Sequence, residues 1–238
     1  MGQRDEGVFG VEARRGEIRK ACKALAVDDL DPVERQLAAA LHGFDQAGTD
    51  EAGRGPLAGP VVAAAVIIED YFEELEEIND SKKLTEKKRA ELFPKIVELA
   101  VDYELVRMTP QEVDTLNIFQ ARMEGFKRAI EILAKRTGAI YAVIDGNKKP
   151  LNTAVETDVL VKADAILPGV SCASIVAKHS HTIAICNLAK QEPYSKYGLE
   201  KHKGYGTKVH MEALQKYGPI EGFHRFSYQP VKDSIKSI

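Results

Sequence analysis

The chain has 238 residues, of which 44% are hydrophobic and 29% charged, with a formal net charge of −3 and a pI near 6.1. This length allows one sizeable domain with an appendage, or two small domains, and the composition is ordinary for a globular protein. The slightly acidic balance excludes a globally basic surface. Any binding of nucleic acid must therefore depend on local basic patches.

The sequence also argues against membrane insertion, secretion and a disulfide framework. The longest apolar run, residues 61–68, is far too short to cross a bilayer, and the first residues contain no secretory signal. Cys22, Cys172 and Cys186 are an odd number of thiols without CxxC spacing, which is typical of packing or surface thiols in a reducing compartment. We therefore expect a cytoplasmic protein.

Residues 1–42 differ in character from the rest of the chain. They read as two short, charged amphipathic helices, with Asp31 and Pro32 as the cap and first-turn residue of the second helix. From Phe44 onward, short apolar runs alternate with longer segments of helical period. We therefore divide the chain into a helical extension, 1–42, and a larger domain, 43–238.

The larger domain is predicted to be α/β. Short apolar runs predict strands at 61–68, 139–144 and 158–161. Apolar residues spaced three and four positions apart predict helices at 85–100, 117–136 and 171–189. Thr85 is the expected N-cap of the first of these helices, which Pro94 should end or kink. The fully apolar early strand indicates a sheet covered by helices on both faces.

Two adjacent acids, Asp50 and Glu51, begin a glycine-rich stretch directly before the first apolar strand. Neighbouring side chains on an extended strand point to opposite faces, so the two carboxylates could share a metal only if the backbone bends there. Gly53, Gly55 and Gly59 would allow such a bend. A surface hairpin with two solvated acids is the alternative. A nucleotide-binding loop is disfavoured, because neither GxGxxG nor GxxxxGK[ST] occurs in this stretch.

Two further acids follow predicted strands. Asp145 ends the strand Tyr141–Ile144 and precedes Gly146, and Asp164 follows the run Asp158–Val161. Sheets of the α/β class place ligands at the carboxyl ends of their strands, so these carboxylates are candidate metal ligands. Hard oxygen ligands favour Mg²⁺ or Mn²⁺ over zinc.

At this point a resemblance becomes specific. The segments DEAGRGPLAGPVVAAAV, INDSKKL, VIDG, VKAD, SIVAK, KHKGYGTK and HRFSYQPV occur in the order and spacing of bacterial ribonuclease HII. The similarity covers about Gly48 to Val231. It implies the RNase H-like fold, with a central mixed β-sheet flanked by helices and a helical C-terminal part. It also implies that the metal-binding carboxylates are Asp50, Glu51, Asp145 and Asp164.

The same resemblance implies the reaction and the substrate contacts. Members of this family hydrolyse the RNA strand of RNA-DNA hybrids and cut 5′ of single ribonucleotides in DNA duplexes, leaving 3′-hydroxyl and 5′-phosphate ends. Two divalent ions, Mg²⁺ or Mn²⁺, assist this hydrolysis. The activity serves ribonucleotide removal, repair and primer removal. The residues that match substrate-contacting positions of the family are Gly53, Arg54, Gly55, Asn79, Ser81, Lys82, Tyr205 and Thr207.

Two alternatives stay open at the level of sequence. A type 3 ribonuclease H is the nearest rival, although Arg54 stands where that class carries lysine. A binding protein that has lost catalysis is another, because Ala163 replaces a usual glycine and residues 179–182 depart from the family pattern. His179 and His181 are not expected to bind metal. We expect a monomer that keeps cleavage after removal of residues 1–40.

Overall fold

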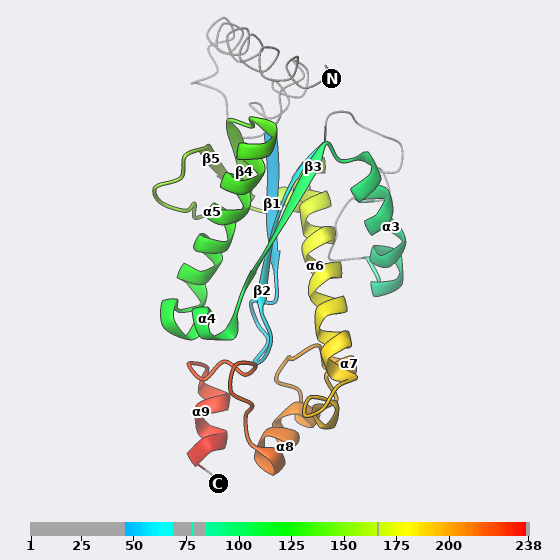
Figure 1. Cartoon of the computed structure of the whole chain (residues 1–238), viewed down its shortest axis with the longest axis vertical. Coiled ribbons are helices and arrows are strands. Elements are labelled where there is room, and N and C mark those ends of the chain that lie inside the picture. The colour runs from blue at the N-terminus through cyan, green and yellow to red at the C-terminus, as the bar shows by residue number, and fades with distance from the viewer. Residues whose placement is uncertain (1–45, 69–77, 79–83, 166, 237–238) are drawn as a thin grey trace, which may run out of the picture.

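The computed structural model describes residues 46–68, 78, 84–165 and 167–236 (Figure 1). Within them, a five-stranded sheet has the order β3-β2-β1-β4-β5. The strands are β1 (Gln46–Ala52), β2 (Val61–Ile67), β3 (Asp102–Met108), β4 (Tyr141–Asp145) and β5 (Glu156–Leu160). Neighbours pair antiparallel from β1 to β3 and parallel from β1 through β4 to β5. The carboxyl ends of β1, β4 and β5 therefore lie at the same edge of the sheet.

Helices cover both faces of this sheet, as the apolar patterns predicted. They are α3 (Glu86–Leu99), α4 (Pro110–Leu116), α5 (Ile118–Thr137), α6 (Pro168–Ala189), α7 (Leu199–His202), α8 (Lys208–Tyr217) and α9 (Gln229–Lys236). In Figure 1, α5 lies on one side of the sheet, α6 and α3 lie on the other, and α7 to α9 lie beyond the turn that joins β1 to β2. The predicted mixed sheet and helical C-terminal part are confirmed. The predicted extension, 1–42, lies outside the described residues.

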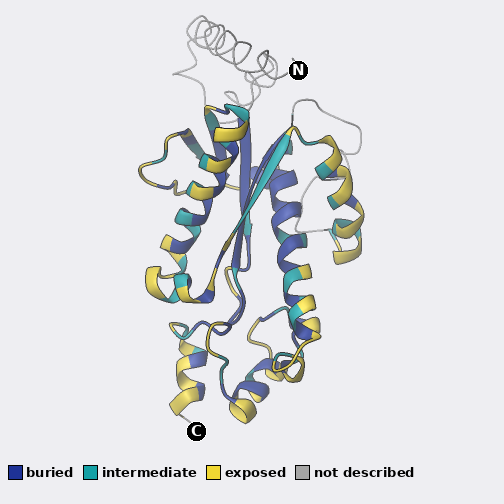
Figure 2. Cartoon of the chain, viewed as in Figure 1, coloured by how far each residue is buried: buried dark blue, intermediate teal, exposed yellow. Residues whose placement is uncertain are grey.

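Strand β2 forms the centre of the core because both of its faces are covered. Every residue of β2 is buried, and Figure 2 shows β1, β2 and most of α6 buried as well. Along the strand, Ala63 and Ala65 pack with Phe126 of α5, whereas Ala64 and Val66 pack on the α6 side. This alternation follows from the pleat of the strand, and it explains the uninterrupted apolar sequence.

One close approach of backbones determines where α6 meets β1. A Cβ atom added at Gly48 would lie 2.2 Å from the carbonyl carbon of Gly169 and 2.3 Å from the nitrogen of Val170. Only glycine fits at position 48, since real side chains do not tolerate such distances. This contact brings the first turn of α6 against the strand that carries Asp50.

The predicted cap of α3 is confirmed, and the helix does not end at Pro94. The Thr85 side chain accepts a hydrogen bond from the Lys88 amide, and the helix continues through Pro94 to Leu99. Proline removes one backbone donor without preventing helical angles from continuing on either side. The helix therefore does not end where the sequence suggested it could.

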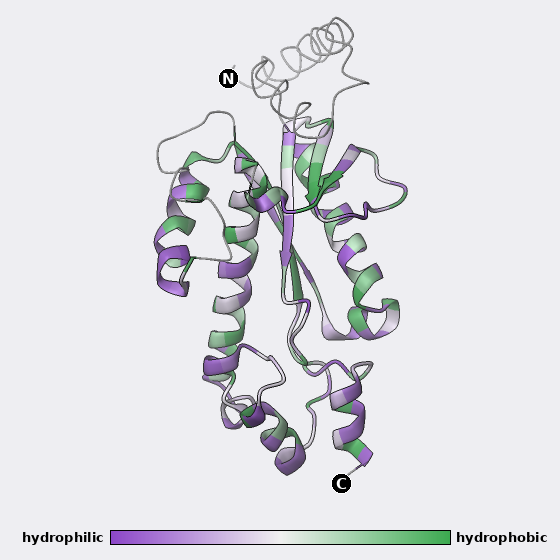
Figure 3. Cartoon of the chain, turned by 180° about the vertical axis from the view of Figure 1, so that it is seen from behind, coloured by the Kyte–Doolittle hydropathy of each residue, from purple (hydrophilic) through white to green (hydrophobic). Residues whose placement is uncertain are grey.

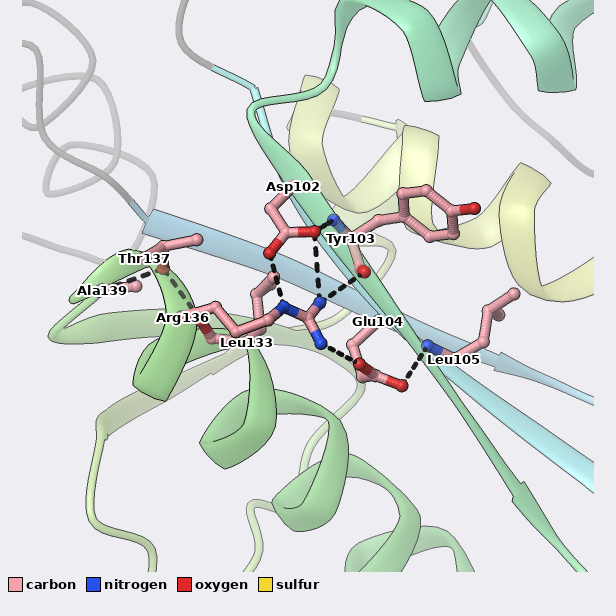
Figure 4. Close-up of polar contacts among 8 residues, drawn as sticks. All are labelled: Asp102, Tyr103, Glu104, Leu105, Leu133, Arg136, Thr137 and Ala139. Atoms are coloured by element: carbon pink, nitrogen blue, oxygen red, sulfur yellow. Dashed lines mark hydrogen bonds and ion pairs between the residues drawn. The ribbon is translucent and has the colours of Figure 1, made fainter. Parts of the chain in front are cut away.

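The sequence reading missed β3 and α4. Strand β3 is only partly buried over most of its length and carries Asp102 and Glu104, so it lacks a strong apolar pattern. Figure 4 shows what holds its start: Arg136, in the last turn of α5, donates to Asp102 and Glu104 and to the Tyr103 carbonyl. These charged contacts come from another element, so the local sequence did not reveal them.

Hydrophilic and hydrophobic residues alternate along the C-terminal helices α8 and α9 (Figure 3). Among the described helices, none combines the length and the apolar character that crossing a membrane requires.

Candidate active site

Three aspartates converge at the shared edge of the sheet. Asp50 lies on β1, Asp145 ends β4, and Asp164 lies in the 3₁₀ turn η3 (Ala163–Ala165) that precedes α6. One carboxylate oxygen of each lies within 4.8 Å of the others. Asp50 is 6% exposed and Asp164 1% exposed, so these charges meet where little water can screen them. We call this group the aspartate cluster.

A short hydrogen-bonded turn brings Asp164 to the cluster. The Asp145 carboxylate accepts a hydrogen bond from the Ala163 amide at 2.8 Å, and the Gly146 amide donates to the Leu160 carbonyl at 3.0 Å. Asp164 therefore lies in a 3₁₀ turn and not directly at the end of a strand. The left-handed position is Lys162, with φ of 62°, whereas Ala163 has no positive φ. Replacing the usual glycine by Ala163 therefore introduces no strained angle.

The cluster is electrostatically unfavourable without cations. Burial, followed by the charge of Glu51, raises the pKa of Asp50 to about 7. Ser174 and Lys178 oppose this shift, and the Lys178 ammonium lies 4.0 Å from the Asp50 carboxylate. Three converging carboxylates, two of them buried, fit a site for divalent cations. Asp50, Asp145 and Asp164 offer the oxygen ligands that Mg²⁺ and Mn²⁺ prefer.

Glu51 does not join the cluster, and the predicted backbone bend is absent. Asp50 and Glu51 keep regular antiparallel pairing with β2, opposite Ala64 and Ala63. Their side chains consequently point to opposite faces of the sheet. Asp50 faces α6, while Glu51 faces α5 and forms a bidentate ion pair with Arg122. The glycines that follow bend the chain only after the strand has ended.

The two histidines of α6 have other surroundings than the aspartate cluster. His179 stacks on Phe93 with ring centroids 4.5 Å apart. His181 is buried against Gly53, and burial together with the charge of Arg225 lowers its pKa to about 4. The group of potential metal ligands found among the described residues contains neither histidine.

The Gly53-Arg54-Gly55 turn is held from beneath by Arg225, a residue 0% exposed. The Arg225 guanidinium donates to the carbonyls of Gly53 at 2.6 Å, Arg54 at 3.1 Å and Gly59 at 2.9 Å. The Tyr228 hydroxyl also donates to the Arg54 carbonyl, at 2.8 Å. Gly53 itself has φ of 86°, and a Cβ there would lie 2.6 Å from the Pro60 carbonyl oxygen.

This anchoring leaves the other side of the turn open. Arg54 and Gly55 are exposed, and within the described part of the chain no hydrogen bond engages their amides. The turn therefore presents backbone donors to solvent while its carbonyls are held inward. Sequence reasoning missed Arg225 and Tyr228 as supports. They lie in the quoted segment HRFSYQPV, but nothing local indicated that they reach residues about 170 positions earlier.

Tyr205 lies directly beside this turn. A Cβ added at Gly55 would lie 3.0 Å from the Tyr205 ring, which is 50% exposed. The two loops are joined by a hydrogen bond from the Leu57 amide to the Gly204 carbonyl at 2.8 Å. The structure thus brings together Gly53, Arg54, Gly55 and Tyr205, which the sequence had assigned to one substrate surface.

Buried histidines support the Tyr205 loop from inside. His210 contacts the Tyr205 carbonyl through Nδ1 at 3.0 Å, and its Nε2 lies 3.2 Å from Nε2 of His224. Because Nδ1 of His224 accepts from the Ile220 amide, His224 donates and His210 accepts in the contact between their Nε2 atoms. Both rings are then neutral, and burial lowers the pKa of each.

The remaining predicted substrate residues have different outcomes. The Thr207 hydroxyl accepts a hydrogen bond from the His210 amide and caps α8, which gives Thr207 a structural role at the exposed rim. Asn79, Ser81 and Lys82 lie outside the described residues.

Comparisons with known proteins agree with this arrangement. The family model described as "Ribonuclease HII" matches residues 47–231. Ribonuclease HII of Neisseria meningitidis serogroup B is 44% identical over 79% of this chain and 94% of its own length. Ribonuclease HII of a Marinomonas species is 47% identical over 80% and 92%.

Solved structures show the same architecture. Ribonuclease H2 from Pyrococcus horikoshii OT3 superposes with a TM-score of 0.68 at 28% identity, covering 81% of this chain and 98% of that one. Bst-RNase HIII, solved in complex with Mn²⁺, gives a TM-score of 0.69 at 19% identity over 87% and 74%. The second likeness concerns the fold alone, and both agree with the predicted RNase H-like architecture.

Proposed function

Because this chain belongs to the ribonuclease HII family, and is thus a metal-dependent endoribonuclease acting on RNA paired with DNA, we propose that it also cuts 5′ of single ribonucleotides in DNA duplexes. The observation that carries this proposal is the contact between the Gly53-Arg54-Gly55 turn and Tyr205. Recognising one ribonucleotide requires a sensor for its 2′-hydroxyl, and the family resemblance implies that a tyrosine beside it contacts the deoxyribose that follows. The turn and the tyrosine supply two adjacent surfaces of that kind.

The proposed chemistry is hydrolysis assisted by two divalent ions, Mg²⁺ or Mn²⁺. Asp50, Asp145 and Asp164 would hold these ions, and Glu51 would join them once it leaves Arg122. When bound, two such ions activate the attacking water and stabilise charge on the leaving oxygen. Lys178, 4.0 Å from Asp50, balances part of the carboxylate charge. The products would carry 3′-hydroxyl and 5′-phosphate ends.

The turn would read the 2′-hydroxyl through its backbone. Arg225 and Tyr228 hold the carbonyls of Gly53 and Arg54, so the turn has its shape before substrate arrives. The exposed amides of Arg54 and Gly55 can then donate to a phosphate or hydroxyl oxygen at little conformational cost. Tyr205 would stack on the next sugar, where its half-exposed ring is accessible.

The test is cleavage of a labelled DNA duplex that contains one ribonucleotide, with Mg²⁺ or Mn²⁺. Wild-type protein should cut on the 5′ side of the ribonucleotide, and Asp145→Asn should lose at least a thousandfold in rate. An all-DNA duplex and a full RNA-DNA hybrid serve as controls. Cleavage of the hybrid alone would favour type 3 behaviour. No cleavage of either substrate by folded protein would favour a binding protein without catalysis.

We further propose that residues 43–238 form the catalytic domain and residues 1–42 an extension, and that the protein acts as a cytoplasmic monomer on RNA-DNA hybrids and on DNA duplexes with embedded ribonucleotides. The family match over residues 47–231 supports the division, since it begins close to the proposed boundary.

A further inference from the structure

Glu51 is held by an arginine in a buried ion pair that spans two elements. Nε of Arg122, on α5, lies 2.7 Å from Oε1 of Glu51, and Nη2 donates to Oε2 at 3.1 Å. The two side chains are 12% and 11% exposed. Both carboxylate oxygens therefore lie close to the guanidinium, although only the Nη2 contact has hydrogen-bond geometry and the buried Nε has no hydrogen-bond partner.

The surroundings hold Arg122 in this position. Its guanidinium lies 5.5 Å from the ring centre of Phe126, one turn further along α5. A Cβ added at Gly146, the residue after Asp145, would lie 3.7 Å from Nη2 of Arg122. The guanidinium thus occupies the space between Glu51 and the carboxyl end of β4, next to the aspartate cluster.

Arg122 and a divalent ion would compete for the negative charge of Glu51. The ion pair uses both carboxylate oxygens, and Glu51 lies on the face of β1 opposite to Asp50. A carboxylate oxygen has two lone pairs, so sharing is chemically allowed, but a divalent ion that recruits Glu51 must bind beside the Arg122 charge in a poorly solvated place, where like charges repel strongly.

We propose that Arg122 is an internal competitor for the metal at Glu51. The aspartate cluster takes the first divalent ion, and binding of the second requires displacement of Arg122 from Glu51. This inference rests on the proposed two-ion chemistry. Its consequence is a wide separation between the two metal affinities, so that the free metal concentration controls how much of the protein carries both ions.

The experiment is calorimetric titration of the full chain with Mn²⁺ at pH 8.5, in the absence of nucleic acid. The variants are Arg122→Gln, Arg122→Lys, Glu51→Gln and the double variant Glu51→Gln with Arg122→Gln. Arg128→Gln is the matched control, because Arg128 lies on the same helix and pairs with Glu112 and Glu124 away from the cluster. Thermal unfolding of each variant with and without Mn²⁺ verifies folding and gives a second measure of binding.

Arg122→Gln should tighten the weaker Mn²⁺ step by about tenfold, because the metal no longer has to displace a cation from Glu51 in a poorly solvated place. Arg122→Lys should tighten it less, since lysine keeps the charge but loses the paired contact. In the Glu51→Gln background the same Arg122 substitution should change Mn²⁺ affinity by about threefold or less. Arg128→Gln should have no effect.

The double-mutant comparison separates competition from a general charge effect. Equal tightening with and without Glu51 would mean that Arg122 acts only through its field, and would overturn the proposal. Unchanged or weaker Mn²⁺ binding in Arg122→Gln would make Arg122 a support that orients Glu51, and would also overturn it. If wild-type protein binds no Mn²⁺, the metal site of the proposed function fails together with this inference.

Discussion

The aspartate cluster and the Gly53-Arg54-Gly55 turn differ in how their buried charges are compensated. In the cluster, carboxylates of like charge meet, and burial raises the pKa of Asp50 to about 7. Under the turn, a single buried cation, Arg225, is surrounded by the carbonyl oxygens of Gly53, Arg54 and Gly59. The first region keeps negative charges close together, and the second satisfies its charge with hydrogen bonds.

This difference indicates which region needs an occupant. Buried charges are costly unless they are paired or hydrogen-bonded. In the cluster, Ser174 and Lys178 offset the burial of Asp50 only in part, so a divalent cation would stabilise its ionised form further. The turn is complete without any ligand and is preorganised for substrate. Substitutions in the two regions should therefore have opposite effects on the stability of the metal-free protein.

The largest effect is expected for Asp50→Asn. Cleavage should fall at least a thousandfold, because a cluster ligand is lost. The metal-free protein should nevertheless gain about 2 kcal/mol in unfolding free energy at pH 8, because the neutral amide removes a buried charge from the cluster. Urea unfolding in EDTA, compared with unfolding in Mg²⁺, checks both statements. A loss of metal-free stability would show that the cluster is not strained.

Arg225→Lys should have the opposite signature. Lysine cannot reproduce the planar fork that reaches three carbonyls, so unfolding free energy should fall by about 3 kcal/mol. Cleavage of the single-ribonucleotide duplex should fall about hundredfold in kcat/KM. Mn²⁺ affinity should stay within about twofold of wild type. Unchanged Mn²⁺ affinity would show that the lower cleavage rate does not come from general unfolding of the protein.

The exposed Arg107 provides the control, and Arg107→Lys should leave all three quantities unchanged. If Mn²⁺ affinity falls together with cleavage in Arg225→Lys, the cluster and the turn are coupled and the contrast between them does not hold.

The smallest effect concerns the histidines beneath Tyr205. Burial, followed by the charge of His210, lowers the pKa of His224 to about 3. The unfolded chain therefore binds a proton at His224 below pH 6.5 that the folded protein does not bind. Unfolding free energy should fall as pH decreases from 7.5 to 5, with His224 contributing about 2 kcal/mol. His224→Asn, which keeps an acceptor for the Ile220 amide, should flatten this slope; an unchanged slope would assign it to other groups.

Much of the site could be predicted from sequence because its residues follow strands. Asp145 was expected at the end of a strand, and the structure places it there beside Asp50 and Asp164. The antiparallel pairing of Glu51 contradicted the predicted bend. The alternation of side chains along a strand correctly indicated that Asp50 and Glu51 face opposite ways. The glycines that follow suggested a backbone bend at these two residues, whereas the chain bends only after the strand has ended.

The supporting residues could not be predicted in the same way. Arg225 contacts residues more than 160 positions away in sequence, and Arg122 contacts Glu51 across 71 positions. Similarly, β3 is held by Arg136 from another element and lacks an apolar pattern of its own. Such contacts leave no periodic signal, because periodicity reflects only the face that one element buries.

The sequence by itself determined the α/β class, the buried central strand, the main helices and the acids that gather at the sheet edge. These features depend on the periodic spacing of apolar side chains within one element, and on positions where the local backbone requires a glycine or a helix-capping residue. Only the tertiary structure decided that Glu51 faces Arg122 instead of the aspartates, and that Arg225 sets the shape of the turn. The reason is that the position of a buried charge depends on a partner that folding brings close. The sequence between the two residues does not show that they will be in contact.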